Sequence, residues 1–395
     1  MATTPASTSG RTPTRRPADR KQQIIVAASK LFCERGFHNV SVAEVAAAVG
    51  ITAASLYRHF RNKLDLLSTV VHVAVDDVGR LAAESSDLDD LLRRSASGCL
   101  ERRTSALLWQ REARHLSEAD RLDQRAKLIR AGTLIGGLIQ AQRPDLDDED
   151  AELLAWGMTA LFGSVALHRV SLPRKRFEEQ LIELATSLTR CELGDRPAPG
   201  AEPHRKVPVT SSRENLLNEA IRLFDERGFQ SVSTDEIGQA SGTSGPNIYK
   251  HFPSKTDLLV AAVVRAGEQR RSSTMNALAR AHSAAESLEL LLRSYIDFAV
   301  DHHHLLGVLI GELDQLPDKE RRAAKQTQRE YLALWVDHLA PVLPDNDPAV
   351  NKIKVHAVLS IIDNIVRTGH VGRRPDVAER LVEMCTAVLH PAQTE

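Results

Sequence analysis

Three polar side chains recur in the same order, with the same spacing, at two distant places in the chain. They are Tyr57, His59 and Lys63 in the first place and Tyr249, His251 and Lys255 in the second. A phenol, an imidazole and an ammonium group can each donate a hydrogen bond to an anionic oxygen. Neither histidine has a Ser, Cys or Asp partner arranged for catalysis, and no H-E-x-x-H, P-loop or G-x-S-x-G motif occurs. The sequence therefore predicts binding rather than catalysis, with no catalytic residue, metal site or cofactor.

These triads belong to a longer internal repeat. Residues 28–67 align with 220–259 at a constant offset of 192, and 19 of the 40 positions are identical. A weaker match continues at offset 200, where Glu112 faces Glu312 and Pro144 faces Pro344. The change in offset implies about eight extra residues in the second copy, between 260 and 300. The whole chain is thus predicted to be a duplication.

Helical signals surround both triads. Apolar residues in 24–32 follow the spacing of an amphipathic helix, and Gly36 is placed to end it. Ser41 with Glu44 forms a capping-box pattern, and the helix that it begins ends at Gly50. Ser233 and Glu236 repeat the capping box, and Thr52 and Ser244 are placed to cap a short third helix. Two helices joined by a tight glycine turn at this spacing predict a helix-turn-helix in each copy.

The composition of the 395 residues supports an all-α protein. Aromatic residues make up only 4% of the chain, so the cores must consist mostly of Leu, Val, Ile and Ala. The four cysteines are scattered, which fits a reducing cytoplasm, and no apolar run is long enough for a membrane span. The formal net charge is −1, but residues 11–67 carry ten Lys/Arg against four Asp/Glu, whereas residues 204–259 carry seven of each. Only the first copy therefore has a basic footprint.

The runs L-F-x-E-R-G-F-x-x-V-S and L-Y-R-H-F-x-x-K-x-D-L-L resemble the DNA-binding domain of the TetR family. The resemblance implies a regulator that binds double-stranded operator DNA as a two-fold dimer and releases it when a small-molecule effector enters a C-terminal cavity. We therefore expect two tandem units, each with a three-helix DNA-binding domain and a helical ligand-binding and dimerisation domain. The expected divisions are a disordered basic arm (1–19), the first helix-turn-helix domain (20–67), its regulatory domain (68–193), a proline-rich linker (194–212), the second helix-turn-helix domain (213–259) and its regulatory domain (260–395).

The resemblance also assigns contacts with DNA. Both triads match the residues with which the family contacts the phosphate backbone of DNA. The residues at the start of the recognition helix are then expected to contact the bases. Asp235 replaces Ala43 at the start of the preceding helix, so the two copies should read different half-sites. The DNA-contacting set in copy 1 is completed by Ser41, Thr52, Ala53, Ala54, Ser55 and Arg58. In copy 2 it is completed by Ser233, Ser244, Gly245, Pro246, Asn247 and Lys250.

A second implication concerns assembly. Family dimers form a four-helix bundle, which here matches 150–169 with 174–191 and 348–369 with 376–389. Gly157, Ala160 and Gly163 would allow close approach. Because both halves are in one polypeptide, the simplest expectation is an intramolecular pseudo-dimer; whether whole chains pair again into homodimers is left open.

The effector is the least determined feature. Leu108, Trp109, Leu134, Leu138 and Phe162 are candidates for the lining of a cavity in copy 1, although the same residues would serve as core. Their composition favours an apolar ligand. Three functions stay open: a ligand-released repressor that reads DNA with both copies, a regulator in which copy 2 serves only assembly or partner docking, and a ligand-free architectural DNA binder. Activation in place of repression is also open.

Overall fold

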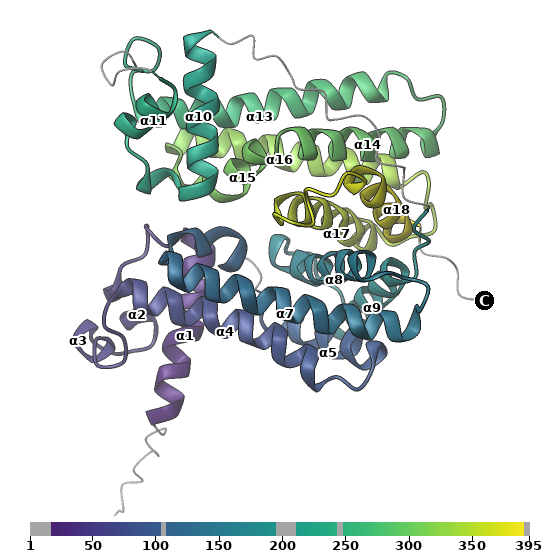
Figure 1. Ribbon diagram of the computed structural model, residues 1–395, viewed down its shortest axis with the longest axis horizontal. Coiled ribbons are helices and arrows are strands. Elements are labelled where there is room, and N and C mark those ends of the chain that lie inside the picture. Colours follow the sequence, from purple (N-terminus) through teal and green to yellow (C-terminus); the bar gives the residue numbers. More distant parts are fainter. Residues whose placement is uncertain (1–16, 104–107, 195–210, 243–247, 391–395) are drawn as a thin grey trace, which may run out of the picture.

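The computed structural model describes residues 17–103, 108–194, 211–242 and 248–390, and all its regular elements are helices (Figure 1). Copy 1 comprises α1 (Pro17–Arg35), α2 (Val42–Ala48), α3 (Ala53–Leu56), α4 (Lys63–Glu84), α5 (Leu88–Glu101), η1 (Leu108–Glu112), η2 (Ala113–His115), α7 (Glu118–Gln142), α8 (Asp148–Gly163), η3 (Ser164–Leu167) and α9 (Arg174–Thr189). Copy 2 comprises α10 (Ser212–Arg227), η4 (Phe229–Ser231), α11 (Thr234–Ala240), α13 (Lys255–Leu278), α14 (Ala284–Asp301), α15 (His303–Gly311), η5 (Leu313–Gln315), α16 (Asp318–Leu339), α17 (Pro348–Arg367) and α18 (Val377–Leu389).

The predicted boundaries shift slightly at two helices. α1 begins at Pro17, inside the range assigned to the N-terminal arm, and α10 begins at Ser212, the last residue assigned to the linker. Ser211 caps α10 by accepting a hydrogen bond from the backbone N–H of Glu214. The eight extra residues of copy 2 are divided among the end of α13, the following loop and the start of α14. None of the described helices is long and apolar enough to cross a membrane.

Each helix-turn-helix domain folds around its own apolar core. Phe32 and Phe60 are buried in copy 1, as are Phe224 and Phe252 in copy 2. Both predicted capping boxes are present: the backbone N–H of Glu44 donates to the Ser41 hydroxyl over 3.2 Å, and the Ser41 N–H donates to the Glu44 carboxylate over 2.7 Å. Ser233 and Glu236 form the same pair. The caps fix where the second helix of each domain begins.

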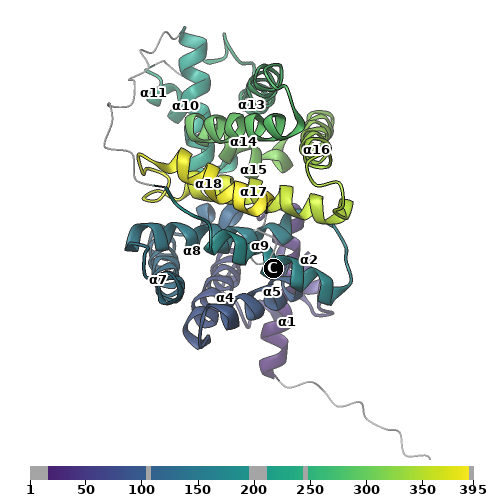
Figure 2. The same ribbon diagram turned by 90° about the vertical axis from the view of Figure 1, so that its right-hand side faces the viewer.

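Helices of both copies share one core at the centre of the molecule. α8 and α9 of copy 1 lie against α17 and α18 of copy 2 (Figures 1 and 2). A Cβ atom at Gly157 would collide with the side chain of Met384, and the buried Ser360 hydroxyl donates to the Ala160 carbonyl over 2.8 Å. The small residues of α8 thus allow the two backbones to approach closely.

A buried charge network crosses one end of this bundle. The Arg374 guanidinium of copy 2 lies 2.5 Å from the Asp150 carboxylate of copy 1, and Arg380 lies 3.5 Å from the same carboxylate. Asp376 pairs with both arginines, at 2.9 and 3.1 Å. Because these side chains are almost fully buried, each charge depends on its partners in the network.

A second contact between the copies lies next to the helix-turn-helix domains. Arg111 pairs with Asp314 at 2.6 Å, and Arg114 donates to the Gly311 carbonyl over 2.9 Å. At the offset of 200, position 111 corresponds to 311 and position 114 to 314, so the two contacts are related by an approximate two-fold axis. The positions are symmetric, but the residues are not: arginines occupy both in copy 1, and glycine and aspartate occupy them in copy 2.

A buried and a half-buried histidine from different copies lie against each other in the interface, and they predict acid sensitivity. The rings of His168 and His356 lie 4.7 Å apart, and burial lowers the pKa of His168 to about 3 and that of His356 to about 4. A depressed histidine pKa costs nothing above the ordinary value near 6.5, where both states are neutral, and it disfavours the folded state as the pH falls below that value. Between pH 7 and 5 the free energy of unfolding should fall by about 2 kcal/mol for each histidine.

Urea unfolding at both pH values checks this prediction against a His168→Gln/His356→Gln variant. The variant should lose less stability on acidification than the unaltered chain. Equal losses would show that these two rings do not titrate on unfolding.

Candidate functional site

The predicted DNA-reading surface of copy 1 is formed by α2, α3 and the turn after α3. Thr52 caps α3 by accepting a hydrogen bond from the Ser55 N–H over 3.2 Å. Tyr57 is 52% exposed, although large aromatic side chains are usually covered. The remaining predicted residues fall into two groups: Ser41, Ala43, Thr52, Ala54 and Arg58 are exposed, and Ala53, Ser55 and His59 are half-buried. The surface thus offers a phenol, a guanidinium and hydroxyl groups to a ligand.

Copy 2 presents a related but more acidic surface. Tyr249 is 54% exposed, and its hydroxyl lies 3.3 Å from the hydroxyl of Thr234 at the start of α11. Ser233, Asp235 and Lys250 are exposed, and His251 is half-buried. The predicted DNA-contacting residues Ser244, Gly245, Pro246 and Asn247 lie outside the described residues.

The two lysines of the triads are placed differently from the prediction. The Lys255 ammonium donates to the carbonyls of Phe229 and Val232 over 2.8 Å each and lies 4.4 Å from the centre of the Phe229 ring. The Lys63 ammonium lies 4.2 Å from the centre of the Phe37 ring, and burial lowers the pKa of both lysines. In this structure both ammonium groups point into their own domains, where they hold the turn after the first helix. Arg58 and Lys250 are exposed cations at the two surfaces, and Arg61, in the turn after α3, is exposed as well.

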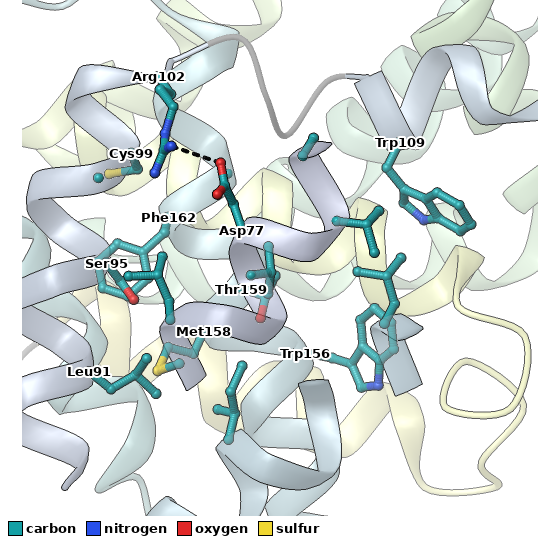
Figure 3. Close-up of a pocket in the computed structure, with 18 of the residues that line it drawn as sticks. Asp77, Leu91, Ser95, Cys99, Arg102, Trp109, Trp156, Met158, Thr159 and Phe162 are labelled. Carbon is teal, nitrogen blue, oxygen red and sulfur yellow. Dashed lines mark ion pairs between the residues drawn. The ribbon is translucent and has the colours of Figure 1, made fainter. Parts of the chain in front are cut away.

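Copy 1 contains a partly open apolar cavity of about 170 Å³ between α4, α5, α7 and α8 (Figure 3). Leu91, Met158 and Phe162 contribute to its lining, and Trp109 and Trp156 lie at one end. At the other end, Arg102 and Asp77 form an ion pair of 2.8 Å. Cavities of about this size accept small apolar molecules.

The structure places the five predicted lining residues in different surroundings. Trp109 and Phe162 line the cavity, but Leu108 is buried in the core of the helix-turn-helix domain. Leu134 is 47% exposed, and Leu138 packs against the central core without reaching the cavity. The apolar pattern of α7 could not separate these roles, because core, cavity and surface leucines look alike in sequence.

The corresponding place in copy 2 is filled by aromatic side chains. Positions 95, 98 and 135, which line the cavity in copy 1, are Ser95, Gly98 and Ile135; at offset 200 they become Tyr295, Phe298 and Trp335. All three aromatic side chains are buried, and the Tyr295 hydroxyl donates to the Asp363 carboxylate over 2.7 Å. The place that is hollow in copy 1 is therefore filled in copy 2, whose own pocket of about 330 Å³ lies elsewhere, between α13, α15 and α16.

A buried glutamate ties each regulatory domain to its helix-turn-helix domain. The Phe37 N–H donates to the Glu112 carboxylate over 3.1 Å, and the Phe229 N–H donates to the Glu312 carboxylate over 3.0 Å. Burial raises the pKa of both glutamates, that of Glu312 to about 7. Trp109 of the cavity precedes Glu112 in the same short helix, η1. The cavity is thus one helical turn away from the contact with the domain that carries Tyr57.

Comparisons with known proteins agree with this architecture. The family described as "Bacterial regulatory proteins, tetR family" matches residues 24–70 and 216–262. The chain is 29% identical over 135 residues to the HTH-type transcriptional activator FasR of Mycolicibacterium smegmatis, covering 34% of this chain and 61% of FasR. It is also 29% identical over 115 residues to the HTH-type transcriptional repressor KstR2 of that organism, covering 27% and 56%.

A third relative is the nucleoid occlusion factor SlmA of Glaesserella parasuis, at 29% identity over 126 residues, with 31% of this chain and 62% of SlmA covered. The chain thus spans about three fifths of the length of these curated relatives. A solved TetR-family regulator from Bordetella parapertussis 12822 aligns with 46% of this chain and 95% of its own at 18% identity and a TM-score of 0.43. The two matched segments coincide with the two helix-turn-helix domains of the structure. The chain is a member of the TetR family of regulatory proteins, with two copies of the DNA-binding domain in one polypeptide.

Proposed function

We propose that this chain is a cytoplasmic transcriptional repressor whose two copies act as an intramolecular pseudo-dimer on operator DNA. The observation that carries the proposal is the shared bundle of α8, α9, α17 and α18, since family dimers join through such a bundle. Both helix-turn-helix domains lie at the same end of the molecule, at the left of Figure 1. One chain can therefore offer two reading domains to one operator.

Release of DNA would begin in the cavity of copy 1. A small apolar ligand there would contact Trp109 and displace η1, which holds the first helix-turn-helix domain through Glu112. Arg114, two residues further along the chain, pairs with Glu312 at 2.8 Å, so the displacement would reach the second domain as well. One ligand for each chain would then change the angle between two reading domains.

The alternative is that only copy 1 reads DNA and copy 2 serves assembly. The exposed Asp235 and the balanced charge of residues 204–259 favour it. The exposed Tyr249 and Lys250 support reading by both copies.

Footprinting and binding titrations on the region upstream of the protein's own gene separate the two functions. We expect Arg58→Ala and Lys250→Ala each to weaken binding about fivefold to tenfold and to lower the salt dependence by about one phosphate contact. Lys175→Ala is the control, since this lysine is exposed on α9, far from the reading domains in sequence. Two dissimilar protected half-sites are also expected.

If Lys250→Ala binds like the control and the footprint is a palindrome, two chains must meet on DNA and the alternative function holds. These surface arginine and lysine side chains are better probes than Lys63 and Lys255, because replacing either of the latter would also loosen its domain.

A further inference from the structure

A second cavity, of about 600 Å³, lies between the copies and shares a wall with the apolar cavity of copy 1. Trp109, Leu128 and Trp156 line both hollows. The larger one continues between α7 of copy 1 and the ends of α10 and α17 of copy 2. A ligand whose apolar part occupies the copy 1 cavity would reach the space between the copies by moving the two indoles that separate them.

The lining of this second cavity is strongly cationic. Arg121 and Arg125, one turn apart on α7, both face it, and neither guanidinium forms an ion pair with another described residue. Arg227 and Arg367 of copy 2 complete the cluster, although they already pair with Glu236 at 2.6 Å and Asp225 at 3.2 Å. Two uncompensated guanidinium groups next to two others make a site that favours an anion with more than one charge.

Copy 2 leaves room for one of these groups. A Cβ atom on Gly369 would stand 3.0 Å from the Arg125 guanidinium, so glycine lets that side chain pass into the cavity. The acidic residue in the lining, Glu226, is engaged by Arg222 at 2.8 Å. The positive charge in the cavity is thus left for a ligand.

We propose that the effector is an amphipathic phosphate: its apolar body enters the copy 1 cavity, and its phosphate is held between the copies by Arg121 and Arg125. This inference rests on the proposed function, in which the apolar cavity is the effector site, and it adds the chemical class of the effector. Phosphate suits the site because a dianion can accept from both guanidinium groups at once.

Such a ligand would touch both reading domains directly. Its body would press on Trp109, in the helix that holds Phe37 through Glu112. Its phosphate would lie beside Arg227, which joins the end of α10 to Glu236 in α11, the second helix of the copy 2 domain. The ligand thus bridges the two copies at the point from which both domains are oriented.

Calorimetric titration of the full chain with octyl phosphate, octanol and inorganic phosphate tests the proposal. Octyl phosphate should bind more tightly than either fragment, by about tenfold or more, because each fragment makes only one of the two sets of contacts. An Arg121→Gln/Arg125→Gln variant should bind octyl phosphate no better than octanol, with octanol affinity unchanged. Arg130→Gln, an exposed arginine on the same helix, is the matched control.

A Ser95→Tyr/Gly98→Phe variant carries the residues of copy 2 at these positions. It should bind neither octyl phosphate nor octanol. Thermal unfolding checks that each variant is folded. If the double-arginine variant keeps full affinity for octyl phosphate, or if inorganic phosphate alone binds as tightly, the bridging phosphate site is wrong. If Ser95→Tyr/Gly98→Phe no longer binds octanol, the proposed function still stands after that result. If Ser95→Tyr/Gly98→Phe binds octanol normally, the assignment of the apolar cavity as the effector site is wrong.

Discussion

Asp150→Ala is expected to lower the free energy of unfolding by about 3 kcal/mol, because it leaves two buried guanidinium groups short of a counter-charge. Arg374 and Arg380 would then share Asp376, with Glu383 as a further partner of Arg380 at 3.0 Å. The lost carboxylate belongs to copy 1 and both arginines to copy 2, so the loss acts on the contact between the copies. Asp150→Asn keeps an acceptor and should cost less.

Urea unfolding of the full chain measures this loss. Glu179→Ala is the control, because Glu179 is 63% exposed and its ion pair with Lys175 spans 3.8 Å. Exposed pairs of this kind contribute about 0–1 kcal/mol. A loss for Asp150→Ala as small as that of the control would mean that the buried arginines find other partners or water.

Replacing either buried glutamate should weaken operator binding about tenfold or more, with the larger effect at Glu312. Glu312→Ala leaves the Phe229 N–H without an acceptor and removes the carboxylate that pairs with Arg114 at 2.8 Å. Glu112→Ala leaves the Phe37 N–H without an acceptor. An unsatisfied buried donor costs about 1–3 kcal/mol, and more where a charge is involved, so each domain should lose its fixed orientation.

Amide hydrogen exchange at Phe37 and Phe229 locates the effect, and operator titration measures its size. Glu112→Gln should behave nearly like the unaltered chain, since its amide oxygen can accept the same hydrogen bond. Equal exchange at Phe229 in Glu312→Ala and in the unaltered chain would contradict an anchoring role for this carboxylate.

Much of the architecture could be predicted from local signals. Capping boxes, glycine turns and helical periodicity depend on residues close together in sequence, and the duplication doubled every signal. The sequence also indicated that the two buried glutamates occupy equivalent positions, because the match at offset 200 pairs Glu112 with Glu312. Their hydrogen bonds to the helix-turn-helix domains span 75 and 83 residues, however, and no local pattern reports such a contact.

The ligand site could not be predicted to the same depth. Leu134 and Ile135 are neighbours on α7, yet one is exposed and the other lines the cavity. A comparison of Ser95, Gly98 and Ile135 with their aromatic counterparts in copy 2 would have indicated that this place is filled in copy 2. The orientation of Lys63 and Lys255 toward their own domains had no sequence signal, because the same spacing suits an inward or an outward ammonium group.

The mismatched charges around Arg111 and Asp314 bear on how the two halves of the gene can evolve. Recombination between duplicated halves tends to make them identical. Here, conversion of Asp314 to its copy 1 counterpart would set an arginine against Arg111, and conversion of Arg111 to glycine would remove the copy 1 partner of Asp314, which also pairs with Lys325 of copy 2 at 3.0 Å. Either exchange weakens the contact, so selection on this single pair would preserve the divergence of the halves and, with it, an operator preference that need not be symmetric.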